Sequence, residues 1–191
     1  MPRIGLDLPT LLTAAAEIAD REGFEAVTLA SLAQKLQIRS PSLYNHIAGL
    51  PDLRRHLALR GLATLSAQLE QEVAGCTGDD SIRAFSRTYV AFARTHPGLY
   101  EAIQRAPAPD DELLQQAGGR VLDQVYRAMT SYGLEGDAAV HAVRAIRSLL
   151  HGFVTLERQG GFGIPLDLDV TFRLMVDTFL AGVKAMRTGE G

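Results

Sequence analysis

The sequence predicts an all-α protein of about nine helices. Apolar residues recur at spacings of three and four along the chain, no strand pattern interrupts them, and clusters of glycine and proline separate the periodic segments. These boundaries predict helices at 9–21, 29–36, 41–47, 50–73, 80–95, 97–105, 110–132, 137–158 and 168–187.

The composition is that of a globular protein, with 47% hydrophobic residues among 191 and a net charge of −3. No run approaches the roughly 20 apolar residues that span a bilayer, and the first residues lack the apolar core of a signal peptide. We therefore expect a cytoplasmic protein without membrane contact. The one cysteine, Cys76, cannot form an intramolecular disulfide, and it is either an inert thiol or an exposed redox sensor.

The first helix of a predicted helix-turn-helix pair begins after Thr28. Leu29, Leu32, Ala33 and Leu36 share one helical face, and the Thr28 hydroxyl is suited to accept a hydrogen bond from a first-turn N–H. The first helix of the chain ends at a glycine and would pack behind this pair through its alanines.

The turn and the second helix of the pair follow directly. Gln37 stands where such turns often carry glycine, so a strained or different turn is expected there. Ser40 is the expected N-cap and Pro41 the first helical residue. Leu43 and Ile47 face inward, which leaves the polar side chains of this helix outward, where they suit base edges and phosphates in a major groove. An ordinary solvated turn of helix is the alternative.

The charge of this segment supports the nucleic-acid interpretation. Residues 28–60 carry five basic groups against one acidic group, Asp52, which gives a local charge of +4. The basic residues are Lys35, Arg39, Arg54, Arg55 and Arg60.

The run TLASLAQKLQIRSPSLYNHI, followed by AGLPDLRRHLALRGL, resembles the DNA-binding domain of the TetR family of bacterial transcriptional regulators over residues 8–60. The resemblance implies contacts to phosphates or base edges from Thr28, Arg39, Ser40, Pro41, Ser42, Tyr44, Asn45 and His46. Family members often have a lysine at the start of the next helix. This chain has Leu50 there, and Arg54 or Arg55 is the candidate substitute.

Two domains are predicted, a DNA-binding domain at 1–49 and a ligand-binding and dimerisation domain at 50–191. The helix at 50–73 would connect them as a rod of about 36 Å. In the helix at 110–132, the pair Gly118-Gly119 costs about 1 kcal/mol per glycine relative to alanine and predicts a kink or a break.

The last two helices are apolar on more than one face. One face would serve the protomer's core, and the economical cover for the other is the same helix pair of a second subunit, in a two-fold homodimer. RSLLHGFVTLE also resembles the "HG" segment of a subset of TetR C-terminal domains, which makes His151 a packing residue in preference to a metal ligand. The predicted interface residues are Leu149, Gly152, Phe153, Leu156, Phe172, Phe179 and Val183.

Aromatic side chains are concentrated between residues 80 and 132. Each one alone fits a plain core, but together with the resemblance they predict an apolar cavity for a small hydrophobic ligand. The predicted lining residues are Phe85, Tyr89, Phe92, His96, Tyr100, Tyr126, Met129 and Phe153.

The sequence contains no motif of an enzyme. The histidines lack metal-ligand spacing, and neither a phosphate-binding glycine loop nor a nucleophile elbow is present, so we expect no catalysis, metal or cofactor. The favoured function is a homodimeric repressor that binds double-stranded DNA at a palindromic operator and is released by the hydrophobic ligand. An all-α protein-interaction module without DNA binding is the alternative.

Overall fold

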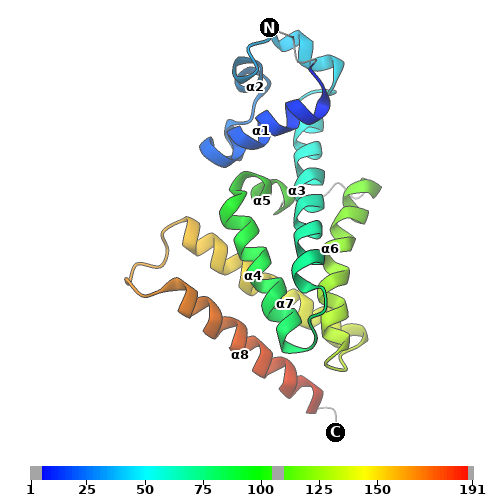
Figure 1. The fold of residues 1–191 in the computed structure, drawn as a ribbon, viewed down its shortest axis with the longest axis vertical. Helices are drawn as coiled ribbons and strands as arrows, with labels where there is room; N and C mark the ends of the chain where they lie inside the picture. The colour runs from blue at the N-terminus through cyan, green and yellow to red at the C-terminus, as the bar shows by residue number, and fades with distance from the viewer. Residues whose placement is uncertain (1–5, 105–109, 189–191) are drawn as a thin grey trace. The chain divides into compact units, whose positions relative to one another are not determined.

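The computed structural model describes residues 6–104 and 110–188, and these residues confirm the all-α prediction. They form nine helices of six residues or more and one shorter 3-10 turn, η1 at Phe24–Ala26 (Figure 1). The α-helices are α1 Leu8–Glu22, α2 Leu29–Lys35, α3 Leu50–Val73, α4 Asp79–Thr95, α5 Pro97–Gln104, α6 Glu112–Thr130, α7 Gly136–Arg158 and α8 Leu168–Thr188, and the 3-10 helix η2 covers Ser40–Asn45.

The predicted boundaries agree with these helices to within about two residues, and at η2 the helix type differs from the prediction. Residue 105, the predicted end of one helix, and the proline-rich segment 106–109 lie outside the described residues. Helix α6 continues through Gly118 and Gly119, so the predicted break does not occur. No helix within 6–104 or 110–188 is both long and apolar enough to cross a membrane.

The chain forms two compact units. Unit 1 contains residues 1–64 and 95–118, and unit 2 contains residues 65–94 and 119–191. Helix α3 therefore contributes its first turns to unit 1 and its last turns to unit 2. The functional boundary expected after residue 49 stays a prediction.

The core of unit 1 is built from α1, α2, η2, the start of α3 and α5. Its fully buried side chains include Leu11, Phe24, Leu32, Leu43, Leu53 and Leu57, each 0–1% exposed. Burial of one such side chain contributes about 1.5–3 kcal/mol. The buttress role expected of the first helix is confirmed, because α1 contacts α2 and its alanines 14, 15, 16 and 19 are buried.

Helix α5 packs closely on α1. A Cβ atom added to Gly98 would lie 2.3 Å from the Ala19 Cβ and 2.4 Å from the Ala19 carbonyl carbon. The backbone N–H of Gly98 donates to Asp20 Oδ1 at 2.8 Å. The two backbones therefore meet where neither helix has room for a larger residue.

Unit 2 is formed by α7, α8, nearly all of α4, the last turns of α3 and the longer part of α6. One face of α7 is buried as expected, through Val143, Ile146, Leu150, Phe153 and Val154. Arg94 on α4 pairs with Glu157 at 2.7 Å and with Asp169 at 3.1 Å, so α4 is tied to α7 and to α8.

Asp79 at the start of α4 connects α6 and α8. It accepts a hydrogen bond from the Tyr132 hydroxyl at 2.8 Å, and Lys184 Nζ lies 2.7 Å from its other oxygen. The bond from Lys184, together with that from Tyr132, holds the pKa of Asp79 below its ordinary value. Three helices of unit 2, α4, α7 and α8, are thus linked by ion pairs as well as by the core, and the turn after α6 is joined to α4 through Tyr132.

Replacing Gly98 by alanine should lower the free energy of unfolding by about 1–3 kcal/mol or more, because the new methyl group must displace backbone atoms of α1. Urea unfolding followed by circular dichroism measures the change.

Gly118→Ala is the matched control, since an added Cβ there meets no atom within 4 Å. Its helix propensity should raise the free energy of unfolding by about 1 kcal/mol at most. Equal stability of the two variants would contradict the close approach of α5 to α1.

Candidate nucleic-acid interface

Helix α2 begins as the sequence predicts, with Thr28 as its N-cap. Thr28 Oγ1 accepts from the Ser31 N–H at 3.0 Å, and the Thr28 N–H donates to Ser31 Oγ at 3.0 Å. Ser31 Oγ in turn donates to the Ala26 carbonyl at 2.8 Å. This reciprocal capping box fixes the entry of the chain into α2. Ser31 was not expected in this role, because the usual residue at this position is glutamate or glutamine.

The turn after α2 is strained at Gln37. Ile38 N donates to the Ala33 carbonyl at 3.0 Å and Gln37 N to the Gln34 carbonyl at 3.1 Å, which is the bonding pattern of a Schellman cap. Gln37 has a φ of +55° and is the only non-glycine residue in the described chain with a positive φ. The strain predicted for a turn without glycine is therefore present.

The second helix of the pair differs from its prediction. Residues Ser40–Asn45 form a 3-10 helix, η2, and its N-cap is Arg39, without a side-chain cap bond. The predicted N-cap, Ser40, is thus wrong by one residue. Ser42 N donates to the Arg39 carbonyl at 2.9 Å, an i→i−3 bond. Only six residues separate this turn from the next loop, which is too few to propagate an α-helix, and Pro41 supplies no donor.

Most of the predicted DNA-contacting side chains at η2 are not engaged in polar contacts within the described chain. The side chains of Arg39, Ser40, Ser42, Tyr44 and Asn45 make no hydrogen bond or ion pair with any other described residue, and Pro41 is exposed beside them. Leu43 is fully buried, which anchors the helix and orients these side chains.

Tyr44 has the most unusual environment of the set. It is 60% exposed and is the only exposed large apolar side chain within residues 6–104. His46 follows at the end of η2, half-buried, and its charge contributes slightly to the lowered pKa of Asp7, which is caused mainly by a hydrogen bond from Thr10. Thr28 is exposed as well, so its hydroxyl is accessible in addition to capping α2.

The local positive charge of residues 28–60 is largely matched within unit 1. Lys35 pairs with Glu17 at 2.8 Å, and Arg54 pairs with Glu25 at 2.9 Å. The guanidinium of Arg55 binds Asp111 in a bidentate arrangement, and Arg60 Nη1 donates to Thr13 Oγ1. Among these five cations, Arg39 alone has no partner within the described residues.

Neither candidate substitute for the missing lysine at Leu50 is free. Arg54 also lies over the Phe24 ring, 5.1 Å from its centroid. The pKa of Asp111 is lowered chiefly by its hydrogen bond from Arg55, so the pair stays ionised well below neutral pH. Asp52 instead caps α3 by accepting from the Ala48 N–H at 2.8 Å. The start of α3 is thus fixed by internal contacts.

The predicted ligand-site residues are distributed over both units. His96 and Tyr100 belong to unit 1, and the other six belong to unit 2. Within unit 2, the rings of Phe85 and Tyr89 stack with centroids 6.3 Å apart. Tyr126 and His96 are half-buried and the remaining six are buried. The hydroxyl of Ser86, next to Phe85, is buried without a partner in the described chain, and the sequence did not single it out.

The predicted interface residues divide into two groups. Phe153, Phe179 and Val183 are buried in the protomer's own core, at 3%, 9% and 1% exposure. Leu149 and Leu156 are exposed, and Gly152 and Phe172 are partly exposed. Further exposed apolar residues outside the predicted interface set lie on α8, among them Leu174 at 58% exposure and Met186 at 42%.

Comparison with known sequences gives matches along nearly the whole chain. Residues 82–179 match the family model described as tetracyclin repressor-like, C-terminal domain. The chain is 38% identical over 183 residues to YobS of Bacillus subtilis, covering 95% of each chain. It is 35% identical over 187 residues to Rv0681 of Mycobacterium tuberculosis, covering 97% of this chain and 85% of that one. Both relatives are named uncharacterized HTH-type transcriptional regulators, and neither is named as an enzyme.

Solved structures share the fold at lower identity. A protein of unknown function from Rhodococcus sp. RHA1 has a TM-score of 0.80 at 23% identity, covering 95% of this chain and 98% of that one. TetR from Acinetobacter baumannii has a TM-score of 0.69 at 19% identity, and the match covers 95% of this chain and 98% of that one. A variant of that TetR was solved in complex with minocycline.

Replacing Gln37 by glycine should stabilise the turn before η2. A left-handed φ costs a residue with a Cβ about 1–2 kcal/mol, and glycine would relieve this strain in the folded state. The greater conformational freedom of glycine in the unfolded chain reduces the resulting gain in stability by about 0.5–1 kcal/mol. We expect the free energy of unfolding to rise by about 0.5–1 kcal/mol in urea titrations.

Gln37→Ala keeps the Cβ atom and serves as the control, so it should gain nothing. A Gln37→Gly variant no more stable than Gln37→Ala would show that the turn is not strained in solution.

Proposed function

The chain belongs to the TetR family of transcriptional regulators, and from this premise we propose that it is a homodimeric repressor whose η2 helices bind a palindromic operator. DNA-binding transcription regulation is common to the relatives. The dimer, the repression and the release by a ligand are the proposed refinements. A protein-interaction module without DNA binding would leave this family membership unexplained.

The observation that carries the proposal is the free polar surface of η2. A tyrosine that is 60% exposed, a guanidinium without a partner in the described chain and an unbonded amide follow one another on a helix whose buried Leu43 fixes their direction. Arginine and asparagine are suited to hydrogen-bond base edges, and tyrosine and serine hydroxyls to bond phosphate oxygens. In a two-fold dimer the two η2 helices would bind half-sites about one helical turn, roughly 34 Å, apart.

The internal pairing of the basic residues defines the kind of DNA binding we propose. Four of five cations in residues 28–60 already have a partner in unit 1, so few of them are available to replace counterions on DNA without first breaking an internal contact. We therefore propose that binding depends on base-edge and hydroxyl contacts plus Arg39, with a shallow dependence on salt concentration.

The exposed stripes of α7 and α8 support the dimer. Leu149, Gly152 and Leu156 lie along one face of α7, and Leu174, Gly182 and Met186 along one face of α8. An added Cβ at either glycine meets no atom within 4 Å, so a partner helix has room to approach. Two such pairs related by a two-fold axis would bury these leucines in a four-helix bundle.

The buried aromatic residues of α4 and α6 support release by a small hydrophobic ligand. The Ser86 hydroxyl, next to Phe85 on α4, is buried without a partner in the described residues, and an unsatisfied buried hydroxyl costs about 1–3 kcal/mol. A ligand that accepts this hydrogen bond would recover that cost. Release would require the ligand to favour the non-binding conformation by about 1–3 kcal/mol.

The operator contacts can be tested on a duplex selected by the wild-type protein from random palindromic DNA. Tyr44→Ala and Asn45→Ala should each weaken binding by about 1–3 kcal/mol. Arg39→Ala should weaken it and also reduce the slope of log K against log salt by about one per subunit. Fluorescence anisotropy over a salt series measures both quantities.

Arg144→Ala is the control for Arg39→Ala, because Arg144 on α7 is also exposed and without an ion pair in the described chain. Wild-type affinity and slope are expected for it. Folded Tyr44→Ala and Arg39→Ala variants that keep wild-type operator affinity would refute the assignment of η2.

The dimer can be tested through its exposed leucines. Leu149→Asp or Leu174→Asp would bury a charge in the interface at a cost of several kcal/mol, so light scattering should show monomers. Operator affinity should fall with the loss of the dimer.

Leu113→Asp on α6 changes an equally exposed leucine, at 56%, outside the proposed interface, and should leave the mass unchanged. Dimers of wild-type stability in both α7 and α8 variants would exclude this interface.

A further inference from the structure

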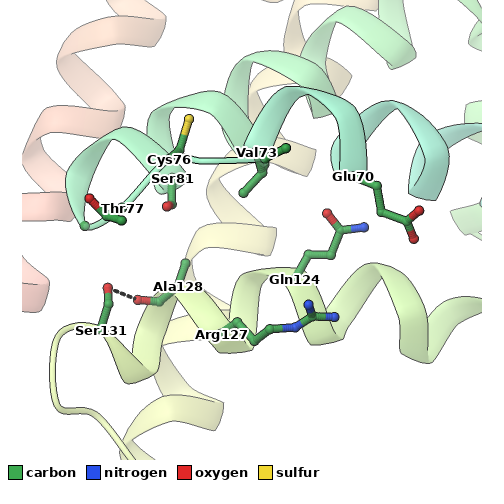
Figure 2. A pocket seen from close by; sticks show the side chains of 11 residues that line it. Glu70, Val73, Cys76, Thr77, Ser81, Gln124, Arg127, Ala128 and Ser131 are labelled. Carbon is green, nitrogen blue, oxygen red and sulfur yellow. Dashed lines mark hydrogen bonds between the residues drawn. The ribbon is translucent and has the colours of Figure 1, made fainter.

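Unit 2 contains a cleft that is separate from the aromatic cluster. It has a volume of about 400 Å³ and lies among the last turns of α3, the loop after it, the first turn of α4 and the last turns of α6 (Figure 2). None of the residues predicted to bind ligand lines it. Its size is at the small end of the roughly 300–1,000 Å³ typical of ligand sites.

Two helices and the loop after α3 supply most of the lining. Glu70 and Val73 come from α3, and Ala74 begins the loop that follows it. Gln124 and Arg127 come from α6; in Figure 2 the Gln124 side chain extends toward α3, and the Arg127 side chain runs along α6. Hydroxyl residues close the other end, namely Thr77, Ser81 and Ser131. The cleft therefore has a charged end, an apolar middle and a hydroxyl-rich end.

Two polar side chains in the lining are almost fully buried, and each has an oxygen atom without a partner in the described chain. Gln124 is 8% exposed; its Nε2 donates to the Ser66 carbonyl at 3.2 Å, but its Oε1 accepts no hydrogen bond from the described residues. Ser81 is 4% exposed, and its hydroxyl has no partner in the described chain. Side chains so buried normally have their hydrogen bonds satisfied. Neither oxygen is among the fully enclosed side-chain atoms that lack a partner, and both residues line the cleft, so a polar molecule in the cleft can bond them.

The two charged side chains at the cleft are also available. Arg127 and Glu70 form no ion pair with each other or with any other described residue, and Glu70 accepts only a long bond, 3.3 Å, from Ser66. A phosphate or a dicarboxylate would be repelled by Glu70, and a polyamine by Arg127. A molecule that carries one ammonium and one carboxylate is attracted by both.

We propose that this cleft is a binding site for a free α-amino acid or a closely similar zwitterion. The ammonium group binds Glu70 and the Gln124 Oε1, the carboxylate binds Arg127, and the side chain extends over Val73 and Ala128 toward the Ser81 hydroxyl. Cys76 takes no part, since its sulfur is turned away from Arg127 and Ser131 in Figure 2. This site is separate from the proposed operator and hydrophobic-ligand sites. Its test does not depend on whether those two sites are confirmed.

The test is calorimetric titration of the full-length protein with each standard L-amino acid at millimolar concentration, in the absence of DNA. At least one amino acid should bind, and its N-acetyl and C-amide derivatives should bind about tenfold more weakly or not at all, because each lacks one charge. Glu70→Gln and Arg127→Gln should each weaken the parent amino acid by about tenfold.

Ser81→Ala separates a loss of binding from a loss of folding, because it removes a hydroxyl that has no hydrogen-bond partner in the described chain. It should keep or raise the unfolding temperature of the free protein and still weaken amino-acid binding. Glu72→Gln and Arg144→Ala change exposed charges outside the cleft and should bind as wild type does. Absence of binding by every amino acid, or unchanged affinity in both Glu70→Gln and Arg127→Gln, would overturn the proposal.

Discussion

The contact between Gly98 and Ala19 is the constraint on which unit 1 depends. Helices α1 and α5 are far apart in the sequence, yet their backbones meet with no space for a side chain at residue 98, and the Asp20 carboxylate holds the Gly98 N–H. Only His96 separates α5 from the end of α4, which carries part of the aromatic cluster. Helix α5 therefore follows α4 after a single residue and is packed on the helix that supports the helix-turn-helix pair.

The electrostatics of unit 1 follow from the same need to hold its helices together. Lys35 fastens α2 to α1, Arg54 fastens α3 to the η1 turn, and Arg55 fastens α3 to the residues before α6. Exposed ion pairs of this kind contribute little stability singly, about 0–1 kcal/mol. In the proposed mode of DNA binding they matter more, because each pairs a cation of residues 28–60 with an acidic group of unit 1. Arg39 is left to supply positive charge beside neutral polar groups.

The sequence predicted the helices well because their apolar periodicity and their glycine and proline boundaries are local properties. It predicted the strain at Gln37 for the same reason, since the missing glycine is visible in the sequence. The error at Ser40 arose because a serine-proline pair fits an α-helical start and a 3-10 start equally well. The local charge of +4 was misleading, because the partners Glu17, Glu25 and Asp111 lie outside the segment that was counted.

Long-range packing also hid the features of unit 2 that matter for binding. The aromatic residues of α4 attract attention in the sequence, but most are buried and would also serve an ordinary core. Gln124 and Ser81 look unremarkable in the sequence, because a glutamine and a serine on helices are usually solvated. Only the fold shows that both are almost fully buried at a cleft, where the Gln124 Oε1 and the Ser81 hydroxyl have no partner in the described chain. A bound molecule can supply the hydrogen bonds of these oxygens, so these two inconspicuous residues, and not the aromatic ones, define the buried polar contacts that the cleft offers.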